Sequence, residues 1–134
     1  MSNLCPCGTN KIFNNCCGRF LNGAEHAKTP EQLMRSRYSA HVLLSQGMRG
    51  YGEYLVSTWL MAVELGLTAA SFTEHKVNWQ KLEVLHTAQH GYHGEVEFKA
   101  YFYPANSTSE LQVHHEHSIF KRVKGLWYYV EARK

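Results

Sequence analysis

The spacing of hydrophobic and polar positions changes close to Trp79. Before this residue the apolar positions recur every three or four residues, as on one face of an α-helix. After it they alternate with polar positions, as in a half-buried β-strand. Helices followed by antiparallel strands predict an α+β fold, with the helices packed on one face of a curved, four-stranded antiparallel sheet.

The clearest helix start is the stretch T-P-E-Q. Thr29 is suited to the N-cap, Pro30 to the first helical position, and Gln32 to completing a capping box. The helix is expected to run to about Gln46 and to stop at Gly47. Arg37 is the one charged residue within its apolar stripe, which consists of Leu33, Met34, Tyr38, Ala40, Val42 and Leu44.

Other helical segments are less sharply bounded. Residues 20–28 are interpreted as a short linker before the first long helix. A second helix is expected from about Met48 or Gly50 to Trp59, and helical pieces should continue to about Asn78, interrupted at Gly66.

Four strands are predicted, at residues 81–89, 95–102, 111–123 and 126–133, and Lys124-Gly125 is expected to form a two-residue hairpin turn. Pairing across this turn predicts four cross-strand pairs on one face: Arg122 with Trp127, Phe120 with Tyr129, Ser118 with Glu131, and Glu116 with Arg133. A slip of one residue would reverse the face that meets the helices, so periodicity alone leaves that face open.

Composition narrows the class of protein. The chain has 134 residues, a net charge of +3 and 44% hydrophobic residues, and no stretch approaches the roughly 18 apolar residues that a membrane helix needs. Its start has neither a basic leader nor an apolar segment typical of a secretion signal. We therefore expect a cytoplasmic protein without a membrane partner, and nucleic-acid binding is not indicated because like charges are not clustered.

All four cysteines lie between Cys5 and Cys17, in the pattern C-x-C-x8-C-C. Two close pairs of thiolates on a short loop can supply the tetrahedral ligands of a structural zinc ion, so Cys5, Cys7, Cys16 and Cys17 are the predicted ligands. Redox-active thiols and disulfides are the alternatives. Disulfides are disfavoured because they need an oxidising compartment and because adjacent cysteines bridge each other only with strain.

The stretch from Cys5 to Gly18, with Pro6, Gly8 and Phe13 between the cysteine pairs, resembles the SEC-C zinc motif. The resemblance implies that the four cysteines bind zinc and that the module is a docking element for a protein or ribosomal partner rather than a catalytic one.

Four further stretches carry a second resemblance: L-M-R-S-R-Y-x-A from Leu33, Y-L-V-S-T-W from Tyr54, E-H-S-I-F from Glu116 and W-Y-Y-V-E from Trp127. Together they resemble the YchJ family of uncharacterised bacterial proteins. The resemblance implies a cone-shaped, cystatin-like fold similar to nuclear transport factor two, in which helices close over the sheet and leave a pocket. Domains are then expected at residues 1–22 and 29–134, and a homodimer through the outer face of the sheet is common in this fold. Family members often have a second SEC-C motif where this chain ends at Lys134, and often T-W-H-P where it has T-W-L-M.

Arg37 is the candidate centre of such a pocket. A buried guanidinium needs a partner, so Arg37 is expected to form an ion pair with Glu116 or Glu131. Its alternatives are to anchor an anionic ligand or to extend to the surface. The predicted pocket walls are Arg37, Tyr38, Trp59, Glu116, Ser118, Phe120, Trp127 and Tyr129.

Two functional hypotheses follow. The favoured one is a zinc-binding accessory protein with a docking knuckle and a pocket for a small molecule. Such a protein is not expected to be an enzyme. The alternative is a small isomerase or dehydratase with Glu116 as general base and Arg37 orienting the substrate. His114, His115 and His117 are interpreted as surface or core residues rather than a second metal site.

Overall fold

The computed structural model describes residues 3–72, 77–105 and 108–133. Short helices η1 (Phe13–Asn15) and α1 (Gly18–Leu21) follow the first cysteines, then come α2 (Pro30–Ser45), α3 (Tyr51–Ser57) and η2 (Ala69–Phe72). The strands are β1 (Asn78–His90), β2 (His93–Tyr103), β3 (Gln112–Val123) and β4 (Leu126–Arg133).

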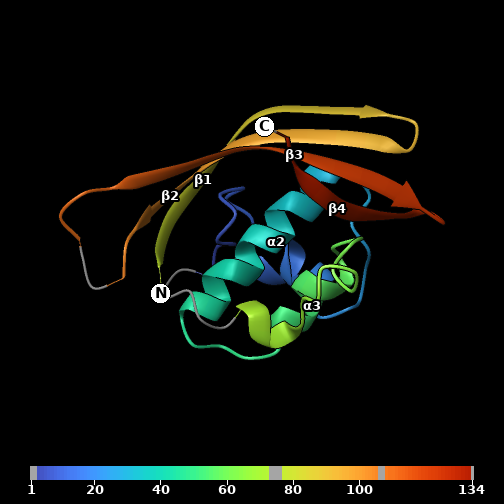
Figure 1. Ribbon diagram of the computed structural model, residues 1–134. Coiled ribbons are helices and arrows are strands. Elements are labelled where there is room, and N and C mark those ends of the chain that lie inside the picture. The colour runs from blue at the N-terminus through green and yellow to red at the C-terminus, as the bar shows by residue number, and fades with distance from the viewer. Residues whose placement is uncertain (1–2, 73–76, 106–107, 134) are drawn as a thin grey trace.

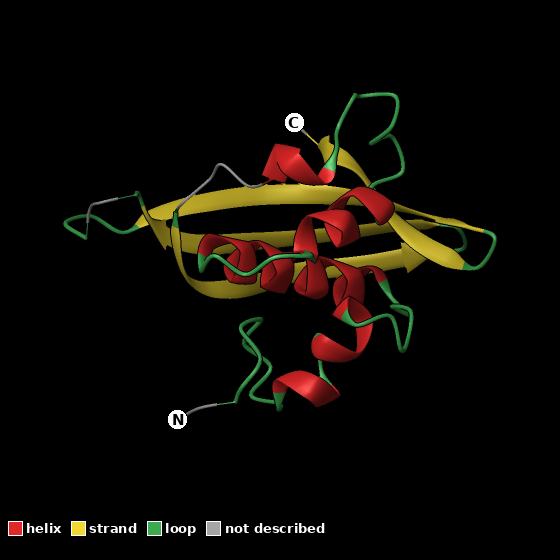
Figure 2. Ribbon diagram, turned by 90° about the horizontal axis from the view of Figure 1, so that it is seen from below, coloured by secondary structure: helices red, strands yellow, loops and turns green. Residues whose placement is uncertain are grey.

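The strands form one antiparallel sheet in the order β1-β2-β3-β4, and the helices lie on one face of it (Figure 1). Seen from below, α2 lies along the sheet, and the N-terminal loop lies beside α2 rather than over the strands (Figure 2). The α+β class, the four-stranded antiparallel sheet and the one-sided helix layer are therefore confirmed. In the described part of the chain, no helix has the length and apolar character that crossing a membrane requires.

The start of α2 is as predicted. The Thr29 side chain accepts a hydrogen bond from the backbone N–H of Gln32 at 3.1 Å, which satisfies one of the amides left free at a helix start. The Gln32 side chain reaches back one residue further than a standard capping box and accepts from the backbone N–H of Lys28 at 2.8 Å. The chain entering α2 is thus held from both directions.

The segments around α2 differ from their predictions. Residues 18–21 form α1 and Phe20 is buried, so the expected linker begins with a packed residue. The second helix ends at Ser57, and Asn78 begins β1 rather than ending a helical stretch. Part of the predicted helical tail, residues 73–76, lies outside the described residues.

The β3–β4 hairpin confirms two predicted pairs and corrects two. Lys124 and Gly125 both have positive φ, at 52° and 84°, which suits a two-residue hairpin turn. The expected pairs Arg122–Trp127 and Phe120–Tyr129 are present. Beyond them the register shifts at a β-bulge, because Ile119 pairs with Glu131 and Val130 is passed over. The predicted partners of Ser118 and Glu116 are therefore wrong: Ser118 pairs with Ala132, and Arg133 pairs with His117.

The bulge coincides with a short addition to the edge of β4. Trp59 forms a parallel bridge with Tyr129, with backbone hydrogen bonds from Leu60 N to Tyr129 O at 2.8 Å and from Tyr129 N to Thr58 O at 2.7 Å. The Trp59 indole N–H donates to the carbonyl of Val130 at 3.2 Å. The segment after α3 is therefore fixed to the sheet edge, which places Thr58 and Trp59 over its inner face.

One buried cluster joins the cysteine loop to the rest of the chain. The four cysteines belong to the same core as Leu33 of α2, Leu82 of β1 and Phe120 of β3. Close approach is needed where β2 passes the start of α2, since a Cβ on Gly94 would collide with the ring of Pro30. The loop and the sheet share one core, and the division into two domains stays a prediction.

Candidate functional site

The cysteine loop is a tight turn closed by backbone hydrogen bonds. Cys5 N donates to Lys11 O at 2.8 Å, Phe13 N donates to Asn3 O at 2.8 Å, and Gly8 has a φ of 87°, which favours glycine. The second cysteine pair follows η1 directly, because Cys16 caps that helix and Cys17 precedes α1. Local structure alone therefore brings the two pairs together.

The four sulfur atoms lie within 4.8 Å of one another and all four cysteines are buried. All four are free thiols, and the Sγ atoms of Cys7 and Cys16 are 3.6 Å apart. A tetrahedral ion with bonds of about 2.3 Å to sulfur separates its ligand atoms by roughly 3.8 Å, so the cluster needs only small adjustments to hold a metal ion. With four ligands present, such a site would have no open coordination position.

Residues of α2 support this loop from one side of the helix. Arg35 donates from Nη1 to the carbonyl of Cys7 at 2.6 Å, and the Ser39 hydroxyl contacts the Cys5 sulfur at 3.6 Å. Hydrogen bonds from the Cys17 and Cys7 thiols lower the pKa of Cys5, whereas their hydrogen bonds to Cys5 and their burial raise the pKa values of Cys17 and Cys7. Cys5 is therefore the sulfur that favours the thiolate, the form that binds metals. Sequence reasoning missed Arg35 and Ser39, although their i,i+4 spacing places them on one helix face.

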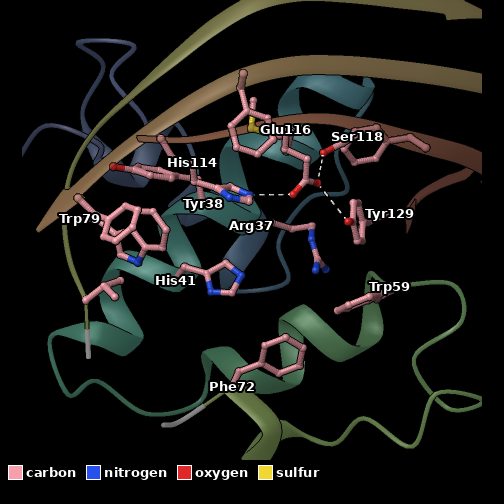
Figure 3. Close-up of a pocket in the computed structure, with 16 residues that line it drawn as sticks. Arg37, Tyr38, His41, Trp59, Phe72, Trp79, His114, Glu116, Ser118 and Tyr129 are labelled. Carbon is pink, nitrogen blue, oxygen red and sulfur yellow. Dashed lines mark hydrogen bonds and ion pairs between the residues drawn. The ribbon is translucent and has the colours of Figure 1, made fainter. Parts of the chain in front are cut away.

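A second site is an aromatic cavity of about 370 Å³ between α2 and the inner face of the sheet (Figure 3). It contains all but one of the predicted wall residues. Trp127 instead lines a separate hollow with Phe20 and Leu33, close to α1. The lining residues are Met34, Arg37, Tyr38, His41, Trp59, Phe72, Val77, Trp79, Phe98, Ala100, Phe102, His114, Glu116, Ser118, Phe120 and Tyr129.

Arg37 does not form the predicted ion pair. Its Nη1 donates to the backbone carbonyl of Leu55 at 2.7 Å and to the Thr58 hydroxyl at 2.6 Å. Its guanidinium carbon lies 4.9 Å from the ring centre of Tyr129 and 5.6 Å from that of Trp59. Burial lowers the pKa of Arg37 to about 10, which still leaves it charged at neutral pH. No carboxylate among the described residues pairs with this cation.

The Glu116 carboxylate instead forms hydrogen bonds with two hydroxyl groups and one histidine ring. Ser118 and Tyr129 donate hydroxyl hydrogen bonds to its Oε2 at 2.5 and 3.1 Å, and Nε2 of His114 lies 2.9 Å from its Oε1. Burial by itself raises the pKa of Glu116, but the three hydrogen bonds outweigh it and the net pKa is lowered. Glu116 is therefore held as a carboxylate.

The histidines of β3 divide between the two faces of the sheet. The hydrogen bond to Glu116 raises the pKa of His114, which lines the cavity although the sequence placed it in no site. On the other face His115 contacts Glu97 at 2.7 Å and His117 contacts Glu95 at 2.7 Å. Among the described residues, the cysteine cluster is the one group of three or more such side chains close enough to hold a metal ion.

The cavity also contains aromatic residues that sequence reasoning missed. Phe72 comes from η2, Trp79 from the start of β1, and Phe98 and Phe102 from β2. The alternation of β2 already predicted that Phe98 and Phe102 share a face. The local sequence pattern did not predict that Phe72 lines the cavity, because its position depends on the path of the chain after α3.

Comparison with known proteins agrees with this architecture. Residues 29–132 match the family model described as the YchJ, middle NTF2-like domain. A UPF0225 protein of Vibrio parahaemolyticus is 38% identical over 98% of this chain and 75% of its own length. A UPF0225 protein of Streptomyces coelicolor is 37% identical over 96% of this chain and 93% of its own length.

Two solved structures share the complete arrangement, including the N-terminal loop. The solution structure of a SEC-C motif-containing protein from Rhodopseudomonas palustris has a TM-score of 0.81 and 33% identity, and covers 97% of both chains. The crystal structure of a SEC-C motif-containing protein from Psychrobacter arcticus has a TM-score of 0.76 and 32% identity, and the match covers 96% of this chain and 80% of that one. The resemblance inferred from the sequence is thus confirmed, and the chain belongs to the YchJ family.

Proposed function

We propose that this protein is a zinc-binding accessory protein whose cysteine loop holds a structural zinc ion and docks on a partner, while its cavity binds a small molecule. The observation that carries the proposal is the set of four buried sulfurs within 4.8 Å of one another. Four thiolates suit zinc, and a site without an open position is structural rather than catalytic in most proteins.

Metal content with thiol titration tests the zinc site. Protein purified without chelator or reductant should contain one zinc per chain, and its four thiols should react with a thiol reagent only after a chelator is added. Metal-free protein whose thiols react at once, or are oxidised, would replace the structural zinc by redox chemistry as the leading hypothesis.

The docking surface that we propose is the outer edge of the cysteine loop. Ile12 is 52% exposed there and forms an isolated β-bridge with Leu4, which is 50% exposed. Exposed apolar side chains on a rigid loop are a suitable docking surface, since little conformational entropy is lost on binding. Asn10, Lys11 and Asn14 are close to Ile12 in the sequence and are also exposed.

Co-sedimentation with purified ribosomes tests one partner directly. The wild-type protein should sediment with ribosomes, whereas Ile12→Ser, which leaves the cysteines in place, should not. Val63→Ser is the matched control because Val63 is an exposed apolar residue outside the loop, at 81% exposure. Equal sedimentation of Ile12→Ser and the wild type would reject the loop edge as the docking surface.

The alternative function, an isomerase or dehydratase with Glu116 as base, is less well supported. A general base works best with a pKa near the operating pH. Glu116 has a lowered pKa and both of its oxygens already accept hydrogen bonds. Proton abstraction would have to break this network first, so the cavity is better suited to binding than to base catalysis.

A further inference from the structure

Arg37 has more hydrogen-bond donors than the protein uses. A guanidinium carries five N–H donors, and both hydrogen bonds of Arg37 leave from Nη1. No described residue accepts a hydrogen bond from Nε or Nη2. The side chain is only 8% exposed, yet no fully buried side-chain nitrogen lacks a partner in the described part of the chain. The unused donors of the guanidinium are therefore not fully buried, and Arg37 lines the cavity.

Most acceptor positions of the Glu116 carboxylate are already occupied. Glu116 has about four acceptor positions, and three of them take hydrogen bonds from His114, Ser118 and Tyr129. These donors partly balance the Glu116 carboxylate, whereas Arg37 has no ion-pair partner among the described residues. Arg37 thus offers spare donors and a positive charge at one side of the cavity, which favours a ligand with an anionic oxygen.

The walls indicate the rest of the ligand. Two rows of rings face each other across the cavity: Trp79 lies 5.9 Å from Tyr38 and 5.2 Å from Phe102, while Trp59 lies 5.1 Å from Tyr129 and 6.2 Å from Phe72. Aromatic walls on two sides favour a planar ring that stacks on one row and meets the other edge-on. The volume of about 370 Å³ is at the small end for ligand pockets.

We propose that the cavity binds a small aromatic carboxylate, with the carboxylate on the free edge of Arg37 and the ring between Trp59 and Trp79. This inference rests on the small-molecule pocket of the proposed function and specifies its ligand. A cationic ligand is the main competitor, because aromatic cages also bind amines. The position over Tyr129 and Trp59 is already taken by the Arg37 guanidinium, which would repel a second cation.

The test uses matched probes that differ only in their polar group. Benzoate and 2-naphthoate are compared with the corresponding neutral amides and with the corresponding aryl methylamines. Binding is followed in a ¹H–¹⁵N spectrum through the indole N–H signals of the chain's three tryptophans. Trp59 and Trp79 line the cavity, and Trp127 does not, so Trp127 is an internal control.

The expected result is that at least one carboxylate shifts the signals of Trp59 and Trp79 and leaves that of Trp127 unchanged. It should bind roughly tenfold or more tightly than its amide, the gain expected for a charged hydrogen bond. The amine should bind most weakly. Equal or tighter binding of an amide or amine, a shift confined to Trp127, or no binding of any probe at millimolar concentration would each overturn the proposal.

Two variants locate the carboxylate. Arg37→Met should remove the preference for carboxylate over amide, and Arg37→Lys should keep part of it, since lysine retains the charge but not the planar fork. Arg133→Met, on the outer face of the sheet, is the control and should bind as the wild type does. An unchanged preference in a folded Arg37→Met protein would overturn the assignment. The wild-type probe series stands if that variant does not fold, and none of these results alters the zinc test.

Discussion

The cysteine loop and the aromatic cavity lie against opposite faces of α2 and differ in how fully their polar groups are satisfied. Arg35 and Ser39 contact the loop, whereas Arg37 and His41 line the cavity, and the two pairs are roughly 160° apart around the helix. In the loop the four sulfurs form a complete ligand set. In the cavity a buried cation keeps unused donors. Four sulfur ligands complete a metal site, which then stabilises the loop. The unused donors of Arg37 are instead available to bind a ligand.

The largest expected effect is the loss of one sulfur ligand. Cys7→Ser removes a fully buried ligand, and a quarter of the roughly 10–16 kcal/mol typical of structural zinc suggests a cost of about 3 kcal/mol or more. Metal analysis and thermal melts should show lost zinc and a clearly lower Tm.

Asn14→Ser is the matched control, because Asn14 is an exposed residue of the same loop. It should keep both the zinc and the Tm. A Cys7→Ser protein that retains zinc and wild-type stability would remove the loop's structural role, and with it the contrast between the two sites.

The next effect concerns Arg37. Arg37→Met leaves Leu55 O and the Thr58 hydroxyl without their charged donor, which should cost about 2–4 kcal/mol of the free energy of unfolding. Because Arg37 forms no ion pair with Glu116, a double-mutant cycle with Glu116→Gln should give a coupling below about 1 kcal/mol.

Urea unfolding of the two single variants and the double variant measures this coupling. Arg133→Met provides the control, with an expected change within about 0.5 kcal/mol, because its ion pair with Glu95 is exposed. A coupling of about 2 kcal/mol or more would show that Arg37 and Glu116 do form the ion pair that the sequence suggested. Arg37 would then have no unused donors for a ligand.

A smaller effect is expected at the Glu116 network. Tyr129→Phe and Ser118→Ala each remove one donor, so each should raise the pKa of Glu116 and cost about 1–2 kcal/mol. A ¹³C NMR titration of the Glu116 carboxyl measures the pKa directly. An unchanged pKa in both variants would mean that these hydroxyls do not hold the carboxylate.

The smallest effect is a pH dependence from the His114–Glu116 contact. The raised pKa of His114 means that its contribution is complete below its ordinary pKa of 6.5 and is lost as pH rises through the folded-state value. The lowered pKa of Glu116 means that its contribution is complete above 4.5 and is lost as pH falls through its folded-state value. The contact should therefore stabilise most between these two pH values.

Urea unfolding of His114→Gln at about pH 5.5 and pH 8.5 tests this window. The variant should lose less than about 1 kcal/mol at the lower pH, since His114 is half exposed, and still less at the higher pH. His86→Gln, an exposed strand histidine, serves as the control. A larger loss at the higher pH would contradict the assigned direction of the pKa shifts.

The two sites also differ in how far the sequence predicts them. The loop was predictable because its ligands lie within thirteen consecutive positions and the turns between them are set locally. Arg37 was recognisable as an anomaly in an apolar stripe, but its partners were not. One is a backbone carbonyl, which carries no sequence signal, and the other, Thr58, is placed by a segment that adds to the edge of β4.

The sheet shows the same limit. Alternation predicted the strands and the Lys124-Gly125 turn, yet it gave no warning of the bulge at Val130, since a bulge adds one residue without changing the composition of the strand. The bulge moved the partner of Ser118 from Glu131 to Ala132 and the partner of Arg133 from Glu116 to His117. Trp127 was assigned to the pocket because the predicted pairing puts it on the same face as Phe120 and Tyr129, but it lies at the start of β4 and lines the hollow that contains Phe20 of α1.

X-ray absorption at the zinc edge of the purified protein tests the central claim most directly, because it reports the neighbours of the metal themselves. A complete sulfur site predicts four sulfur neighbours at about 2.3 Å and no lighter ligand. A nitrogen or oxygen neighbour at about 2.0–2.1 Å, or fewer than four sulfurs, would contradict it, since the loop would then have an open position and the contrast with the cavity would fail.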